Sequence, residues 1–341
     1  MSNTKPIVPK IAWVVLGCVA LRLVCSWTIG NKWSLFAQPE VADYLISQTQ
    51  PTSTPQAPVL ITEPMTEAVL ITQPPEPEPE PMTLPVVTEE PYLFQKADVS
   101  CIDMNYSANR TPDIEGLLTQ TLDWDLATDE PTVLIIHSHG TEAYLPGDGY
   151  TYTEEGGEYR TLDEACNMLA LGEELARLLN EAGIITVQDR SYYDYPDYLT
   201  SYDNARIGLQ EQLNRYPTVK LVIDLHRDSA QRSDGTQWAT EAIINGEKSA
   251  QVMLVMGTDS YYTHPNWEKN LSVALKLQAI MEKTHGGSTR PLDLRKQRFN
   301  QDLSVGAIIA EIGAAGNTYQ EAKNAVSVLA EAIILLANGA N

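Results

Sequence analysis

The sequence predicts an α/β fold, in which a mostly parallel central sheet is flanked by helices on both faces. From about residue 131 to the C-terminus, short apolar runs rich in β-branched residues alternate with stretches of helical periodicity. Such alternation is typical of strands joined by helical crossovers, which leave the strands side by side and parallel. The alternating region is long enough to bury one ample core, so we expect a single folded domain.

The first half of this region contains two expected strands and two expected helices. Pro131 to Ile136 (PTVLII) is an apolar run, and Leu162 to Ala182 has helical spacing that stops at a glycine, a common residue just after a helix. Ile184 to Val187 forms a second short strand. A further helix is expected from Tyr198 to Arg215, because a proline follows that cannot continue it.

The second half repeats the pattern. Val219 to Leu225 (VKLVIDL) and Val252 to Met256 have the length and apolar content of buried strands. Asn270 to Lys283 has helical spacing, and Val305 to Ala310 is another apolar run. A closing helix is expected from about Gln320 to Ala337.

The N-terminal residues 1–32 are expected to form a membrane anchor. Residues 11–29 read IAWVVLGCVALRLVCSWTI, about the length that crosses a bilayer as a helix. Lys5 and Lys10 precede this segment, so the positive-inside rule places the N-terminus in the cytoplasm and the rest of the chain outside. A cleaved signal peptide is the alternative, but no convincing small-residue cleavage site follows Ser26. We therefore expect a single-pass membrane protein with an extracytoplasmic domain.

Residues 33–98 are expected to be a disordered stalk. They are rich in proline, glutamate and threonine, as in ITQPPEPEPEP. Proline removes backbone donors and favours extended conformations, and a segment this poor in apolar residues cannot fold on a core of its own. We interpret it as a semi-rigid spacer that holds a catalytic domain, residues 99–341, away from the membrane.

The charge of the chain excludes one class of partner. The formal net charge is -22, whereas nucleic-acid binding requires clustered lysine and arginine. The four cysteines contain no C-x-x-C pair, which makes a disulfide framework unexpected, although a bridge between Cys101 and Cys166 stays open.

Residues capable of metal binding and acid/base chemistry follow three of the expected strands. His139 follows VLII, His226 follows LVIDL and Glu311 follows AIIA. Ligands of open α/β sheets bind beyond the carboxyl ends of the strands, so these side chains are expected to converge. Two histidines suit a catalytic zinc ion, which takes about three protein ligands and leaves one position open. Glu311 is then the expected general base.

The third ligand is open between two neighbouring acids. Asp163 and Glu164 lie at the start of the expected helix 162–182, where acidic residues also favour the helix dipole. His137 competes with His139, because alternate residues of a strand point to the same face. We prefer His139, which lies further beyond the strand.

Four further residues are candidates for supporting roles. They are expected to orient a metal ligand or to bind a carboxylate of the substrate. They are Glu142 in HGTEAY and Asp224, Arg227 and Asp228 in DLHRDS.

Four phrases together resemble one known family. VLIIHSHGTEAY, DLHRDS, FNQDLS and AEIGAAGNTYQEA, in this order, resemble stage II sporulation protein P, a family of zinc-dependent cell-wall amidases. The resemblance covers essentially the whole chain, since anchor, stalk and catalytic domain also follow that family's layout. It implies hydrolysis of peptidoglycan between muramic acid and L-alanine, an additional endopeptidase activity and a role in septal wall thinning and engulfment during sporulation. The partners it implies are stage II sporulation proteins D and M.

The resemblance also assigns roles to residues. It implies that His139 and His226 are the metal histidines and that Glu311 is catalytic. Glu164 fits the pattern of amidases in general, whereas Asp163 fits the sporulation family, and we slightly prefer Asp163. The FNQDLS phrase adds Asn300, Gln301 and Asp302 as supporting or substrate-binding residues.

Two other functions remain open. One is a non-catalytic wall-binding scaffold of the same fold, which loss of a metal histidine or of the base would have favoured. The other is a different metal-dependent cell-wall hydrolase, such as a polysaccharide deacetylase, which would use another arrangement of ligands.

Overall fold

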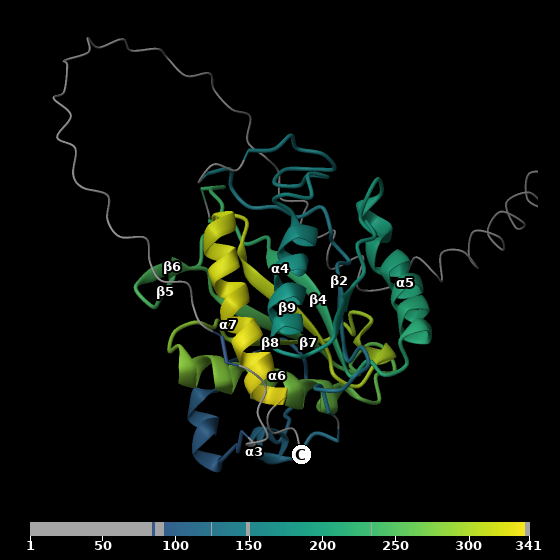
Figure 1. The fold of residues 1–341 in the computed structure, drawn as a ribbon, viewed down its shortest axis with the longest axis vertical. Coiled ribbons are helices and arrows are strands. Elements are labelled where there is room, and N and C mark those ends of the chain that lie inside the picture. Colours follow the sequence, from purple (N-terminus) through teal and green to yellow (C-terminus); the bar gives the residue numbers. More distant parts are fainter. Residues whose placement is uncertain (1–83, 86–91, 124, 148–150, 233, 338–341) are drawn as a thin grey trace, which may run out of the picture. The chain divides into compact units, whose positions relative to one another are not determined.

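A seven-stranded sheet forms the centre of the structure (Figure 1). The computed structural model describes residues 84–85, 92–123, 125–147, 151–232 and 234–337, all of which belong to one unit, residues 78–341. The strands lie in the order β1-β8-β7-β9-β4-β2-β3. Their bounds are β1 Met104–Tyr106, β2 Val133–Ile136, β3 Thr186–Gln188, β4 Leu221–Asp228, β7 Val252–Gly257, β8 Leu292–Arg295 and β9 Ala307–Ala314. A separate antiparallel hairpin consists of β5 Ala242–Ile244 and β6 Glu247–Ser249.

The sheet is parallel except at one ladder. β7 and β9 pair antiparallel, and every other neighbouring pair in the sheet is parallel. Consequently β9, β4, β2 and β3 run in one direction, and the carboxyl ends of β2, β4 and β9 meet at the same edge. The predicted α/β fold with a mostly parallel sheet is confirmed. The sequence did not predict the reversal, because a fully buried apolar run such as β7 reads the same for either direction.

Helices cover both faces of the sheet, as predicted. Alternate side chains of β2 show the two faces: Val133 and Ile135 belong to the large core under α4, α6 and α7, whereas Leu134 and Ile136 pack with Leu209 of α5. Figure 1 shows α4 and α7 lying together over the strands and α5 apart from them. The helix bounds are α3 Ile114–Thr119, α4 Met168–Glu181, α5 Ser201–Arg215, α6 Trp267–Thr284 and α7 Tyr319–Ala337, with 3-10 helices at Lys96–Cys101, Tyr198–Thr200 and Gln301–Leu303.

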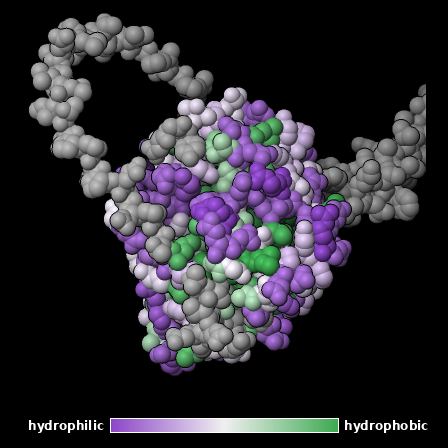
Figure 2. Space-filling model, viewed as in Figure 1, coloured by the Kyte–Doolittle hydropathy of each residue, from purple (hydrophilic) through white to green (hydrophobic). Residues whose placement is uncertain are grey.

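The layer of α4 and α7 has an apolar inner side and a polar outer side. The surface seen in Figure 2, viewed as in Figure 1, is mostly hydrophilic with small hydrophobic patches. The outer side of α4 carries an exposed ion-pair group, in which Arg177 contacts Glu174 and Glu181. Exposed pairs of this kind contribute little to stability, so α4 is held mainly by the apolar side chains beneath it.

Helix α4 begins later than predicted. It starts at Met168 instead of Leu162, because the side chain of Asn167 accepts hydrogen bonds from the backbone N–H groups of Leu169 and Ala170 and caps the first turn. Asp163 and Glu164 therefore lie in the preceding loop and not in a helical turn.

The predicted start of the folded domain at residue 99 falls inside the 3-10 helix Lys96–Cys101. Tyr92 and Phe94, upstream of that helix, already pack against the large core. The predicted anchor 1–32 lies outside the described residues, as does nearly all of the stalk 33–98. Within the described part of the chain, no helix has both the length and the apolar character needed to cross a membrane. Cys101 and Cys166 are free.

One charged side chain lies in the core beneath α6. Lys276 is 2% exposed, donates to the carbonyl of Leu118 and places its ammonium 4.4 Å from the centre of the Phe94 ring. Burial lowers the pKa of Lys276 from 10.5 to about 8. Because the folded protein binds this proton less tightly than the unfolded chain, stability is lost as the pH falls from 10.5 towards 8.

We predict that Lys276→Met changes the pH dependence of stability. At pH 7 the wild type carries the full cost of the buried charge, on the order of 3 kcal/mol at about 1.4 kcal/mol per pKa unit. The variant loses the hydrogen bond to Leu118 at every pH but avoids this cost. Its unfolding free energy relative to the wild type should therefore be highest at pH 7 and fall towards pH 10.5, measured by urea unfolding. The exposed Lys269→Met on the same helix is the control. Parallel profiles for Lys276→Met and the wild type would contradict the prediction.

Candidate metal centre

Two histidines and a glutamate converge at the edge where β2 and β4 end. One ligand atom from each of His139, Glu142 and His226 lies within 4.8 Å of the others, and all three side chains are buried. His139 and Glu142 come from the loop after β2, and His226 belongs to β4. The predicted convergence of His139 with His226 is therefore present in the structure.

A tight turn after β2 brings the first two side chains together. The backbone N–H of Glu142 donates to the carbonyl of His139 over 3.3 Å. This places Nδ1 of His139 3.7 Å from Oε1 of Glu142. Spacing along a strand could not have produced this contact, because β2 ends at Ile136 and the turn then redirects the chain.

His226 reaches the same glutamate from the strand. Its Nδ1 lies 3.5 Å from Oε2 of Glu142, and the rings of His226 and His139 meet edge to face with centroids 4.9 Å apart. Glu142 thus lies between the two imidazoles, and its two oxygens face one ring each.

Charge holds Glu142 ionised although it is buried. Burial alone would raise its pKa, but Arg227 and the two histidines hold the pKa of this carboxyl below its usual value. The backbone N–H of Arg227 also donates to Oε2 of Glu142 over 3.2 Å. Burial lowers the pKa of His139 to about 3, which keeps that ring neutral. Burial acts in the same direction on His226, but Asp224 and Glu142 raise its pKa well above the ordinary value.

This set of groups could hold a metal ion. Two imidazoles and one carboxylate are the donor set of one class of catalytic zinc site, and three donors leave a fourth position for water or substrate. Neutral imidazole and ionised carboxylate are the forms that bind metal. The buried carboxylate between two rings fits a cation, which would take the place of the proton that His226 holds in its absence.

Glu311 lies next to this cluster on the neighbouring strand. β4 and β9 pair so that His226 and Glu311 are direct partners, and paired residues of adjacent strands point to the same face. Oε2 of Glu311 is buried and accepts no hydrogen bond within the described part of the chain. Burial raises the pKa of Glu311 to about 8. A buried carboxyl with one unbonded oxygen, beside a candidate metal cluster, is placed to exchange protons with a bound molecule.

Aromatic residues that the sequence analysis did not single out form a wall against His139. Tyr198 stacks on the ring with centroids 4.5 Å apart, and Tyr202 contacts it edge-on at 5.3 Å. The guanidinium of Arg160 lies 3.6 Å above the Tyr198 ring, and Ser201 Oγ lies 3.0 Å from Nε2 of His139. A signal was present in the sequence: tyrosines four residues apart at the start of a helix share one face.

The two acids expected as the third ligand lie elsewhere. Glu164 forms an ion pair with Arg190 at 2.5 Å, and Oδ1 of Asp163 accepts from the backbone N–H of Ala165 at 3.0 Å. Neither belongs to the cluster, whose acidic member is Glu142. The expectation depended on a helix beginning at residue 162, and that helix begins at Met168.

His137 does not share a face with His139. Its ring packs under α4, where a Cβ added to Gly172 would lie 2.6 Å from it, and its Nδ1 contacts the carbonyl oxygen of Leu225 at 3.2 Å. The expectation that both rings point the same way was wrong, because the strand ends at Ile136 and residues 138–141 form a turn.

Two of the candidate supporting residues stabilise the surroundings of the cluster. Arg227 is 5% exposed and donates to the backbone carbonyls of Ala143 and Tyr159, so it ties the loop that carries Glu142 to β4. Asp228 forms an ion pair with Arg290 at 2.7 Å.

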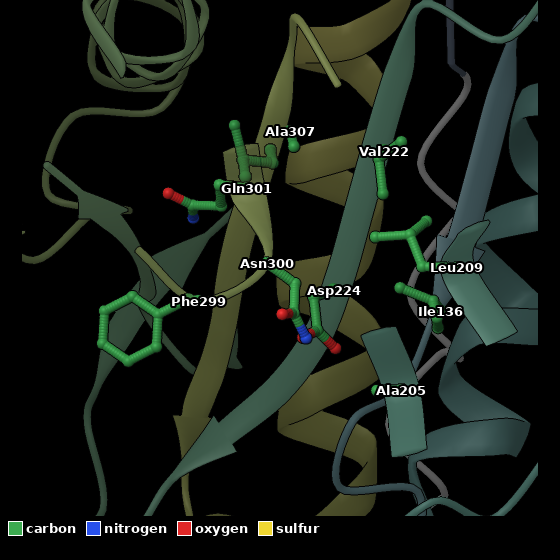
Figure 3. Close-up of a pocket in the computed structure, with 10 residues that line it drawn as sticks. Ile136, Ala205, Leu209, Val222, Asp224, Phe299, Asn300, Gln301 and Ala307 are labelled. Carbon is green, nitrogen blue, oxygen red and sulfur yellow. The ribbon is translucent and has the colours of Figure 1, made fainter. Parts of the chain in front are cut away.

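Asn300, Gln301 and Asp302 lie at the start of the 3-10 helix Gln301–Leu303, with Asn300 just before its first residue. Asn300 donates to the carbonyl of Tyr202, and Asp302 pairs with Arg206. Gln301 bonds to the backbone of Val255 and Gly257 in β7. None of the three belongs to the metal cluster. Figure 3 shows Asn300 and Gln301 among the residues that line a small pocket, which Asp224 also lines.

Comparison with known proteins gives one family and a set of more distant structures. The family model of stage II sporulation protein P matches residues 78–334. Stage II sporulation protein P of Bacillus subtilis (strain 168) is 28% identical over 214 residues, which are 60% of this chain and 50% of that protein. The chain thus spans about half the length of this curated relative.

Among solved structures, similarity is found to amidases. N-acetylmuramoyl-L-alanine amidase AmiC2 of Nostoc punctiforme is 15% identical with a TM-score of 0.36, over 60% of this chain and 93% of that one. The catalytic domain of CwlV, an N-acetylmuramoyl-L-alanine amidase from Bacillus (Paenibacillus) polymyxa var. colistinus, is 12% identical with a TM-score of 0.34, over 60% and 96% of the two chains.

The geometry predicts which acid is needed for metal binding. Glu142→Gln removes a charged member of the cluster, and we expect zinc affinity to fall by at least about 100-fold, more than is typical for loss of a residue that only supports a ligand. Asp163→Asn and Glu164→Gln should bind zinc as the wild type does. Affinity is measured by competition with a chromophoric chelator, and circular dichroism checks that each variant is folded. Loss of affinity in Asp163→Asn but not in Glu142→Gln would reverse the assignment.

Proposed function

The chain belongs to the stage II sporulation protein P family, and on that premise we propose that it is a zinc-dependent hydrolase of peptidoglycan. The observation that carries the proposal is the buried cluster of His139, Glu142 and His226 with Glu311 beside it. Two imidazoles and one carboxylate, beside a buried carboxyl whose Oε2 accepts no hydrogen bond from the described residues, support hydrolysis assisted by a metal ion.

The proposed bond is the amide between N-acetylmuramic acid and L-alanine. The resemblance of the motifs to the sporulation family supports this choice. Cleavage of cross-links between stem peptides is a second activity that the same resemblance implies. The role we propose is septal wall thinning and engulfment during sporulation.

The residues of the site have separate roles in the proposed hydrolysis. Held by His139, Glu142 and His226, a zinc ion would polarise the scissile carbonyl and lower the pKa of water. A cation held by the cluster would favour the ionised form of Glu311, whose pKa burial raises to about 8. The ionised carboxylate takes the proton of the attacking water and passes it to the nitrogen of the leaving amine. Glu311 pairs with His226 across the two strands, so its carboxyl lies next to the cluster but is not one of the three proposed ligands.

We also propose where the enzyme acts and with which partners. The apolar segment 11–29 preceded by Lys5 and Lys10 supports a single membrane anchor with the catalytic domain outside the cytoplasm, in the intermembrane space of the sporulating cell. Stage II sporulation proteins D and M are the partners that the resemblance implies. The net charge of -22 argues against a nucleic-acid partner.

The activity is tested on purified peptidoglycan with the full chain. We expect soluble stem peptides and intact glycan strands, identified by mass spectrometry, and loss of the products when a chelator is added. Glu311→Gln should lower the rate about 10²- to 10⁴-fold, the usual contribution of a general acid/base, while the exposed Glu211→Gln on α5 keeps the wild-type rate.

The same experiment separates the alternatives. Release of acetate without stem peptides would identify a polysaccharide deacetylase. Binding to peptidoglycan without any product would favour a wall-binding scaffold. Cleavage that a chelator does not affect, or an unchanged rate in Glu311→Gln, would contradict the proposed mechanism.

A further inference from the structure

Asp224 connects the two segments that carry the histidines of the cluster. It lies on β4 two residues before His226, and it is 8% exposed. Oδ1 of Asp224 lies 2.9 Å from Nε2 of His226 and accepts from the backbone N–H of Ser138 at 2.8 Å. Oδ2 accepts from the hydroxyl of Ser138 at 2.7 Å. One carboxylate therefore contacts one histidine directly and holds the residue next to the other.

Ser138 completes the arrangement around His226. It is fully buried, and its Oγ lies 2.9 Å from the same nitrogen, Nε2 of His226. The hydroxyl donates its proton to Asp224, which leaves its oxygen as an acceptor for the N–H of His226. All the hydrogen-bonding capacity of Nε2 is thus directed at Asp224 and Ser138, and Nδ1 is left to face Glu142 at 3.5 Å.

Asp224, His226 and Ser138 do not form a nucleophilic triad, although they are the right residue types. In such a triad the carboxylate and the hydroxyl contact opposite nitrogens of the imidazole. Here both contact Nε2, so the carboxylate cannot orient the ring towards the serine as a base. The serine is also 0% exposed, which denies it access to a substrate. The geometry is that of a metal-binding histidine held by a carboxylate on its other nitrogen.

We propose that Asp224 and Ser138 are positioning residues for the metal centre, an inference that rests on the proposed function. Through its side chain Asp224 fixes His226 with the proton on Nε2 and the Nδ1 lone pair towards the ion. Through the backbone N–H of Ser138 it fixes the loop in which His139 follows directly. A single buried carboxylate thereby sets the spacing between the two histidine ligands.

Zinc affinity and the tautomer of His226 test the inference. In the full chain, Asp224→Asn should weaken zinc binding about 10- to 100-fold, as is typical when the partner of a ligand is lost. Ser138→Ala keeps the backbone contact and should weaken it less, about fivefold, the value of one hydrogen bond. Asp189→Asn, which alters a buried carboxylate bound to Ser191 and Tyr193, controls for general disturbance and should bind zinc normally.

Imidazole nitrogen spectra give a second readout that a merely structural role would not change. The chain has five histidines, so the resonances can be assigned. Zinc-loaded wild type should show His226 with its proton on Nε2, and Asp224→Asn should show a weakened hydrogen bond at that nitrogen. Wild-type zinc affinity in both variants would overturn this inference alone. If Asp224→Asn does not fold, wild-type affinity in Ser138→Ala overturns it. If the wild type itself binds no zinc, the proposed metal site fails as well.

Discussion

Parallel pairing of β2, β4 and β9 places the carboxyl ends of these three strands at one edge of the sheet. The residues of the candidate site lie on these strands or directly after them. The register of β4 with β9 makes His226 and Glu311 direct neighbours, so a shift of one residue would turn one of them to the opposite face. The apolar side chains that alternate with them are buried on the other side against α4, α6 and α7. Core packing therefore fixes the register, and the register fixes the position of Glu311 relative to His226.

The described residues around Glu142, between β2 and α4, are held by polar contacts as well as by the burial of Tyr144 in the large core. Arg227 binds the backbone at Ala143 and Tyr159, and Asp194 accepts from the N–H and hydroxyl of Thr141. Buried polar groups are costly unless they are paired, so these contacts leave the loop few alternative conformations. Arg227, a candidate for binding a carboxylate of the substrate, therefore has a structural role in holding this loop.

Much of the fold could be predicted from the sequence, because buried parallel strands and amphipathic helices leave different periodicities. His139, His226 and Glu311 could be located for the same reason, since they follow apolar runs whose carboxyl ends meet. Glu142 could not be assigned as a member of the cluster: its position depends on a turn after β2 that no periodicity encodes. The start of α4 was misjudged because the capping role of Asn167 outweighs the helical spacing of residues 162–167. The antiparallel pairing of β7 was not predicted, because a fully apolar strand has the same sequence pattern in either direction.

The cluster takes two of its members from one turn and the third from a strand much further along the chain. An ion bound by Glu142 and His226 would join segments that are 84 residues apart, as a disulfide does in other proteins. Cys101 and Cys166 are free, so no covalent link between them serves this purpose. Because the site exists only in the folded chain, the binding free energy of an ion would add to the free energy of unfolding, so the supply of the ion would affect stability. A single ion held by these three residues would then serve both the chemistry of the site and the stability of the fold.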